Sequence, residues 1–245
     1  MSLTSSNDLS PSQRRRAELA ANLAAVRARI GAACVAAGRD AAEVTLIAIT
    51  KTWPASDVLL LHELGLADFG ENRDAEAAPK AAAVASAGAA ITWHFVGQLQ
   101  TNKARSVARY ADVVHSVDRD HLVTALGAAA GAAGRELTCL VQVSLDGDPA
   151  RGGVPIDGVP ALAAAVAAEP GLLLGGVMAV APLGVDPAGA FAALRACSDA
   201  VRSVRAAATV ISAGMSDDLE PAIAAGATHL RIGTALLGGR RPPVM

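Results

Sequence analysis

The chain has 245 residues, of which 52% are hydrophobic, and its formal net charge at pH 7 is -2. This length and apolar content predict one domain over residues 1–245, with residues 1–10 as a disordered lead. The charge balance lacks the basic surplus that nucleic acids or anionic membranes attract, so neither is expected as a partner. The three cysteines lie far apart, which favours reduced core thiols in a cytoplasmic protein: Cys34, Cys139 and Cys197.

The first expected element is a helix that begins near residue 10. Ser10 or Ser12 can cap it, Pro11 suits its first turn and Gly38 suits its end. One face of this helix is apolar, with residues at helical spacing: Leu19, Leu23, Val26 and Ile30. The alanine-rich tracts that follow are too short or too interrupted to cross a bilayer, so no membrane segment is expected.

From residue 44 onward, short β-branched runs alternate with longer alanine-rich helical runs, a pattern that predicts parallel strands joined by helices. Eight strands are predicted, at residues 44–50, 67–70, 93–97, 112–117, 137–144, 175–180, 209–214 and 229–233. Eight such units in about 250 residues match a (β/α)₈ TIM barrel, whose site lies at the C-terminal ends of the strands. A doubly wound open sheet is the alternative, but no glycine fingerprint follows the first strand.

A lysine ends the first predicted strand, in the stretch "VTLIAITKTWP" at residues 44–54. Alternation along the strand places Lys51 on the face of Ile47 and Ile49, at the C-terminal mouth of the barrel. A lysine here either marks the strand end and extends its amine to water, or supplies a partly neutral amine that forms a Schiff base with a carbonyl. Its position alone leaves both interpretations open.

The last two predicted strands each run into a turn that can bind an anion. In "SAGMSDDLEPAI", Gly214 allows a close turn and Ser216 can cap the following helix; in "RIGTALLG", Gly233 and Thr234 begin another helix. Barrels often bind phosphate with backbone N–H groups in the loops after strands seven and eight. The two turns together favour a phosphate site.

Arg231 lies within the last predicted strand and shares a face with His229 and Gly233. It is therefore expected to point into the barrel, where a buried guanidinium needs a partner. That partner is either a ring nitrogen of a ligand or a barrel carboxylate.

A Schiff-base lysine, a phosphate cradle and an arginine for a ring nitrogen together describe a site for pyridoxal 5'-phosphate. Five blocks of the chain, in this order, resemble the signature motifs of the pyridoxal phosphate homeostasis proteins: "AITKTWP", "DFGENRDAEAAPK", "WHFVGQLQTNK", "GGVMAV" and "SAGMSDDLEPAIAAGATHLRIGTALLG". The resemblance implies a barrel similar to the N-terminal half of alanine racemase. It also implies storage or delivery of the cofactor in vitamin B6 homeostasis, with apo-enzymes that use this cofactor as the expected recipients. A monomer is expected because the sequence indicates no second domain.

The resemblance assigns a role to each matching residue. Lys51 would carry the Schiff base, Asn72 would lie near the cofactor ring and Arg231 would face the pyridine nitrogen. The phosphate would be held, largely by backbone groups, by Ser212, Gly214, Met215, Gly233 and Thr234. No catalytic residue and no metal ligand is assigned, and His94, His115 and His229 are interpreted as barrel histidines with hydrogen-bond partners.

A weak amino-acid racemase is the alternative function. Alanine racemase works with the Schiff-base lysine on one face of the substrate carbon and a tyrosine from a separate domain on the other. The only tyrosine here, Tyr110, precedes the fourth predicted strand, where a packing role is expected. An arginine at the ring nitrogen stays protonated and so disfavours the pyridinium that makes the cofactor a strong electron sink. The residues therefore predict a protein that holds the cofactor and is not an enzyme.

Overall fold

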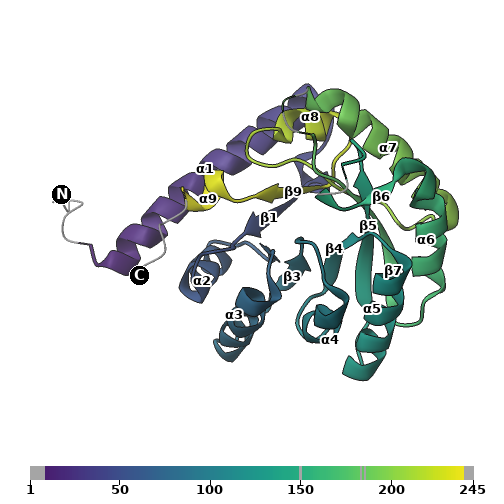
Figure 1. Cartoon of the computed structure of the whole chain (residues 1–245). Helices are drawn as coiled ribbons and strands as arrows, with labels where there is room; N and C mark the ends of the chain where they lie inside the picture. Colours follow the sequence, from purple (N-terminus) through teal and green to yellow (C-terminus); the bar gives the residue numbers. More distant parts are fainter. Residues whose placement is uncertain (1–8, 149–150, 183, 185, 240–245) are drawn as a thin grey trace.

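The computed structural model describes residues 9–148, 151–182, 184 and 186–239, and its centre is a closed barrel of parallel strands (Figure 1). The eight barrel strands are β1 (Thr45–Ile49), β2 (Asp68–Glu71), β3 (Thr92–Phe95), β4 (Val113–Val117), β5 (Leu137–Ser144), β7 (Leu172–Met178), β8 (Val210–Ser212) and β9 (His229–Ile232). Neighbouring strands pair in this order, and β9 pairs with β1 to close the ring. The expected (β/α)₈ barrel is confirmed. A short strand, β6 (Val154–Pro155), which the sequence pattern missed, pairs with β5.

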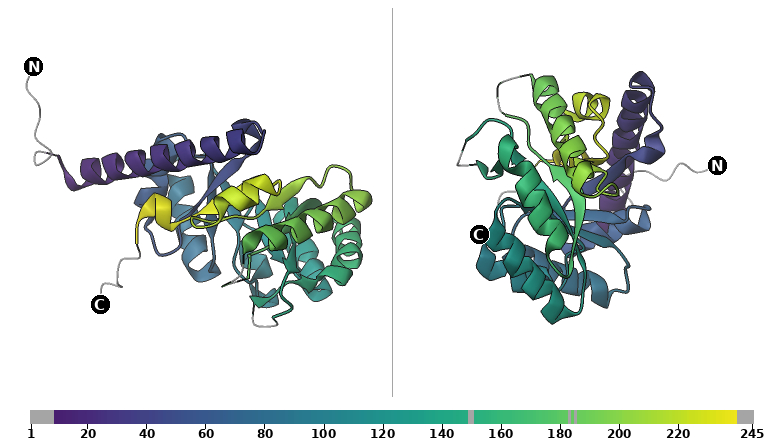
Figure 2. Two further views of the ribbon diagram at one scale, coloured as in Figure 1. Left: turned by 90° about the horizontal axis from the view of Figure 1, so that it is seen from above. Right: turned by 90° about the vertical axis from the view of Figure 1, so that its right-hand side faces the viewer.

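Helices follow the strands and surround them (Figures 1 and 2). They are α2 (Ala55–Glu63), α3 (Asp74–Ser86), α4 (Ala104–Val107), α5 (Asp120–Ala133), α6 (Val159–Ala168), α7 (Pro187–Val204), α8 (Leu219–Ala224) and α9 (Thr234–Leu237). Among the described residues, the connections include the short 3₁₀ helices η1 (Ala41–Glu43), η2 (Thr101–Lys103) and η4 (Ile156–Gly158).

Helix α1 (Pro11–Ala36) precedes the barrel and lies along its flank beside α8 and α9 (Figure 2). Ser10 caps it through a reciprocal capping box with Gln13, so the structure selects Ser10 over Ser12, while residues 1–8 of the expected lead lie outside the described part. The apolar face expected for this helix is buried. By length and hydropathy alone α1 passes a test for a membrane span, but here its buried face packs on the barrel.

Two side chains of α1 hold the end of α9 in place. Asn22 Nδ2 donates a hydrogen bond to the carbonyl of Leu236 at 3.0 Å, and the Arg15 guanidinium donates one to the carbonyl of Leu237 at 3.0 Å. Carbonyls in the last turn of a helix have no partner within it. The N-terminal helix therefore fixes the helix that follows the last barrel strand.

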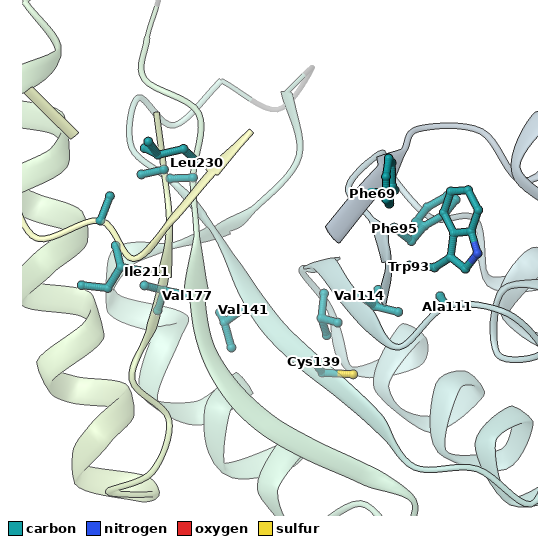
Figure 3. Packing of buried hydrophobic residues seen from close by; sticks show 14 of the residues in the cluster. Phe69, Trp93, Phe95, Ala111, Val114, Cys139, Val141, Val177, Ile211 and Leu230 are labelled. Atoms are coloured by element: carbon teal, nitrogen blue, oxygen red, sulfur yellow. The ribbon is translucent and has the colours of Figure 1, made fainter. Parts of the chain in front are cut away.

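The main apolar core lies between the strands and the helices. Figure 3 shows side chains of this layer from several strands, including Phe69, Trp93, Phe95, Val114 and Cys139. All three cysteines are buried free thiols, as expected. The residues that face the barrel interior are more mixed, because buried polar groups lie there beside Ile47, Ile49, Leu140 and Met178.

Strand β7 begins at Leu172, three residues before its predicted start, and so the prediction of residues 175–180 was misplaced. The glycine pair Gly175 and Gly176 lies inside the strand instead of opening it. A Cβ at Gly176 would lie 2.0 Å from the Val210 carbonyl oxygen, so only glycine allows β8 to approach this closely.

Candidate functional site

A cavity of about 320 Å³ lies at the C-terminal ends of the strands, within the size range of small-ligand sites. Six of the eight residues predicted to bind the cofactor line it: Lys51, Asn72, Met215, Arg231, Gly233 and Thr234. Ser212 and Gly214 are not among the lining residues. The cavity also involves residues that the sequence analysis did not assign to the site: Ile49, Thr52, Trp53, Val96, Val180, Ser216, Asp217 and Gly238.

The loop that carries Lys51 is held by helix α3. Thr52, the next residue, has φ of 69° and is the one non-glycine residue with positive φ in the described chain. This conformation is costly for a β-branched residue. The backbone N–H of Thr52 donates a hydrogen bond to Glu76 Oε1, from the first turn of α3. Glu76 therefore stabilises the strained turn directly after the lysine.

A second lysine, Lys80, is buried beneath this loop. Its Nζ donates hydrogen bonds to the Thr50 carbonyl at 2.8 Å, to Glu71 Oε1 and to Glu76 Oε1 at 3.1 Å. Three acceptors match the three protons of an ammonium group. Burial raises the pKa of the Glu71 carboxyl, and the positive charge of Lys80 opposes that rise. Lys80 is thus a charged structural residue that supports the loop.

Arg231 points into the barrel, as its strand phase predicts, and also lines the cavity. Nη1 donates to Ser212 Oγ at 2.6 Å and Nη2 donates to the Ala179 carbonyl at 2.8 Å. Burial lowers its pKa to about 10, so the guanidinium stays charged at pH 7. In the described part of the chain, no carboxylate lies within ion-pair distance of it, which removes the barrel carboxylate from its observed partners.

The two turns predicted to bind phosphate form one wall of the cavity. Ser216 Oγ accepts a hydrogen bond from the Ala235 backbone N–H at 3.3 Å, which ties the loop after β8 to α9. Helix α9 starts at Thr234 with Gly233 at its N-cap, as predicted, and the first N–H groups of a helix have no partner within it. The N–H groups of Ala235 and Met215 already donate to Ser216 and Asp218, so Gly233 and Thr234, which line the cavity, are the residues of this wall whose N–H groups can face an anion.

The predicted helix cap at Ser216 is wrong. Helix α8 starts only at Leu219, and Asp218 occupies its N-cap position. The Asp218 carboxylate accepts a hydrogen bond from the Met215 backbone N–H at 2.6 Å, so the chain turns before the helix begins. Ser216 is thereby left to contact α9.

Gly214 shapes the turn from behind the cavity wall. Its φ is 90°, and an added Cβ would lie 2.7 Å from Ala222 Cβ and 2.8 Å from Leu230 Cδ2. We expect Gly214→Ala to lower the free energy of unfolding by about 1–3 kcal/mol, the usual cost of overpacking a core. Urea denaturation measures this. Gly31→Ala in α1 is the matched control, since its Cβ would meet no atom within 4 Å. Equal stability of the two variants would contradict the steric role of Gly214.

Close backbone packing places Asn72 at the cavity. A Cβ at Gly97 would lie 2.0 Å from the Asn72 carbonyl oxygen, so the chain after β3 runs against the chain after β2. The Val96 backbone N–H also donates to the Glu71 carbonyl at 2.9 Å. Asn72 therefore occupies a fixed position beside the loop of Lys51.

Tyr110 is not among the cavity-lining residues. Its hydroxyl donates to Asp74 Oδ1 at 3.5 Å, and burial raises the pKa of the phenol. The described residues contain no cluster of three or more His, Cys, Asp or Glu side chains that could hold a metal ion.

The cavity residues fit the cofactor expected from the sequence. Lys51 lies at the mouth of the cavity, and the buried guanidinium of Arg231, which has no carboxylate partner among the described residues, faces the same space. The start of α9 also lines the cavity, and a helix start can bind an anion. One acidic side chain, Asp217, also lines this wall. The fit rests on the donor set and on the size of the cavity.

The amino-acid sequence is similar to a known family model and to named bacterial proteins. Residues 16–241 match the family model described as alanine racemase, N-terminal domain. A pyridoxal phosphate homeostasis protein of Mycobacterium tuberculosis is 45% identical over 251 residues, covering 96% of this chain and 97% of that protein. The Escherichia coli protein of the same name is 37% identical over 227 residues, covering 91% of this chain and 97% of the relative.

Solved structures give the same picture. PipY of Synechococcus elongatus, solved with PLP bound, superposes with a TM-score of 0.78 at 32% identity, covering 90% of this chain and 100% of PipY. Alanine racemase of Corynebacterium glutamicum superposes with a TM-score of 0.68 at 15% identity, covering 94% of this chain and 63% of the enzyme. The second likeness concerns the fold alone, which is related to that of racemases.

Proposed function

We propose that this chain, which belongs to the pyridoxal phosphate homeostasis protein family, binds pyridoxal 5'-phosphate on Lys51 and stores or delivers it in vitamin B6 homeostasis. The relatives carry that name over nearly their whole length, and PipY was solved with PLP bound. When bound, the cofactor supplies an aldehyde that condenses with an amine and a pyridine ring that withdraws electrons.

The observation that carries the proposal is the meeting of Lys51, Arg231 and the start of α9 at one cavity. Lys51 would hold the aldehyde carbon, Arg231 would donate to the ring nitrogen and Asn72 would contact the ring. Backbone groups near Met215, Gly233 and Thr234 would hold the phosphate. In this scheme Gly214 shapes the turn, and Ser212 lies behind Arg231.

Holding the cofactor is favoured over racemising amino acids because the described residues that line the cavity include no well-placed second base. Besides Lys51 and Arg231, Asp217 is the one charged side chain among the described lining residues, and it lies on the wall proposed for phosphate. Tyr110 hydrogen-bonds to Asp74 instead. A permanently charged Arg231 would keep the ring nitrogen unprotonated and the carbanion poorly stabilised.

The proposal also includes a cellular location, recipient enzymes and an oligomeric state. Three buried free cysteines suit a reducing compartment, which supports a cytoplasmic location. Apo-enzymes that depend on pyridoxal 5'-phosphate are the proposed recipients, and a monomer is the proposed state.

One experiment separates storage from catalysis. Protein loaded with pyridoxal 5'-phosphate and freed of excess ligand is incubated with L-alanine in deuterated water, and a second portion is mixed with an apo-enzyme. We expect no α-proton exchange above background, and recovery of the apo-enzyme's activity. Exchange at about 1 s⁻¹ or faster, the low end of ordinary turnover numbers, would establish the racemase alternative.

A further inference from the structure

A chain of hydrogen bonds crosses the interior of the barrel and ends at Arg231. His94 Nε2 contacts Asp68 Oδ1 at 3.0 Å, and His94 Nδ1 contacts His115 Nε2 at 2.9 Å. His115 Nδ1 then contacts Ser212 Oγ at 3.0 Å, which accepts from Arg231 Nη1 at 2.6 Å. His94, His115, Ser212 and Arg231 are at most 5% exposed, so water does not compete for the contacts between them. This series of hydrogen bonds joins residues of β2, β3, β4, β8 and β9.

The two ends of this chain determine its direction. Arg231 can only donate, so the Ser212 oxygen accepts from it. Ionised Asp68 can only accept, so His94 donates through Nε2. With both rings neutral, His94 Nδ1 must accept from His115 Nε2, and His115 Nδ1 must accept the hydroxyl proton of Ser212. Every donor then points toward Asp68.

Burial favours this neutral arrangement at the centre of the chain. His115 is fully buried, and desolvation lowers its pKa well below the ordinary value, with His94 and Arg231 adding repulsion. A second proton on His94 would reverse the middle of the chain. His115 would then donate to Ser212, whose oxygen would receive two donors and whose own proton would need another acceptor.

We propose that His94, His115 and Ser212 form a directional relay, anchored at Asp68, that positions the guanidinium of Arg231 for the cofactor ring. This inference rests on the proposed function, because it concerns the same cavity. The Ser212 hydroxyl donates its proton to His115 Nδ1, so the lone pairs of Ser212 Oγ can accept from Arg231. With the Ala179 carbonyl as second acceptor, the relay determines the plane of the guanidinium and leaves other N–H groups for the cavity.

The relay assigns the Ser212 side chain a positioning role behind Arg231. A phosphate contact expected for this residue would then use its backbone. The three histidines that the sequence analysis left without a function are thereby divided: two belong to the relay, whereas His229 Nδ1 contacts Thr228 Oγ1 at 2.9 Å outside it.

The direction of the relay is tested in the protein without ligand by ¹⁵N–¹H correlation spectra of the histidine side chains at neutral pH. We expect His94 and His115 both to carry their single proton on Nε2. A proton on His115 Nδ1 would overturn the proposed direction, whether or not the cofactor binds.

The positioning role is tested by titrating variants with pyridoxal 5'-phosphate and recording affinity and the absorbance of the bound form. Ser212→Ala and His115→Gln both remove the support for the Ser212 oxygen. We expect each to weaken binding by about 10- to 100-fold, the range for one hydrogen bond to a charged group, and to shift the absorbance maximum. His115→Asn is the matched control, since its amide oxygen can replace Nδ1 as acceptor, and it should stay within about threefold of the unchanged protein.

The outcomes are distinct. Equal losses in His115→Asn and His115→Gln, without a spectral shift, would mean that the ring only fills space and would overturn the relay. A variant that fails to fold by circular dichroism is set aside, and the tautomers then decide. Failure of the unchanged protein to bind the cofactor would refute the proposed function itself and leaves the tautomer result standing.

Discussion

Replacing Lys51 with alanine is expected to abolish covalent capture of pyridoxal 5'-phosphate. Borohydride reduction of the loaded protein, followed by peptide mapping, should place the pyridoxyl group on Lys51 and recover none from Lys51→Ala. The chain contains three lysines, and each lies in a different environment. Lys51 lines the cavity, Lys80 donates to three acceptors, and Lys103 is exposed on η2.

Lys103→Ala is the matched control and should keep full labelling of Lys51. The fold of Lys51→Ala should persist, because the side chain is only half-buried at the mouth of the barrel. A label recovered on Lys80 or Lys103 of the unchanged protein would contradict the assignment of Lys51 as the residue that binds the cofactor. Loss of folding together with loss of the label would give Lys51 a structural role instead.

Lys80→Met is expected to destabilise the protein by about 3–5 kcal/mol, the usual cost of leaving one member of a buried ion pair behind. The Glu71 side chain is fully buried, and its Oε2 has no hydrogen-bond partner in the described structure. Without Lys80, the carboxylate must lose its charge or remain unpaired. Urea denaturation at neutral pH measures the change in the free energy of unfolding.

The double variant Glu71→Gln with Lys80→Met should recover much of that loss, because no buried charge remains. Lys103→Met, at an exposed position, should leave stability almost unchanged. A loss below about 1 kcal/mol in Lys80→Met would show that the pair is replaceable by water or by relaxation of the loop.

Local sequence patterns account for most of the framework. The capping box at Ser10, the apolar spacing of α1 and the start of α9 all depend on residues a few positions apart. Period-two alternation correctly placed Arg231 inside the barrel, because side-chain direction along a strand follows from local geometry. The predicted start of β7 was wrong because glycine usually indicates a turn. Here Gly176 lies inside the strand and permits close contact with β8.

The sequence by itself determined the barrel, the lysine just after β1 and the glycine turns after β8 and β9, because hydrophobic period and turn residues act over short distances. Only the tertiary structure decided the partners of the buried polar groups. His115 and Ser212 are 97 positions apart, and Lys80 and Thr50 are 30 apart, yet each pair forms a buried hydrogen bond. Such contacts arise only when barrel closure brings distant strands together and burial removes water as the competing partner.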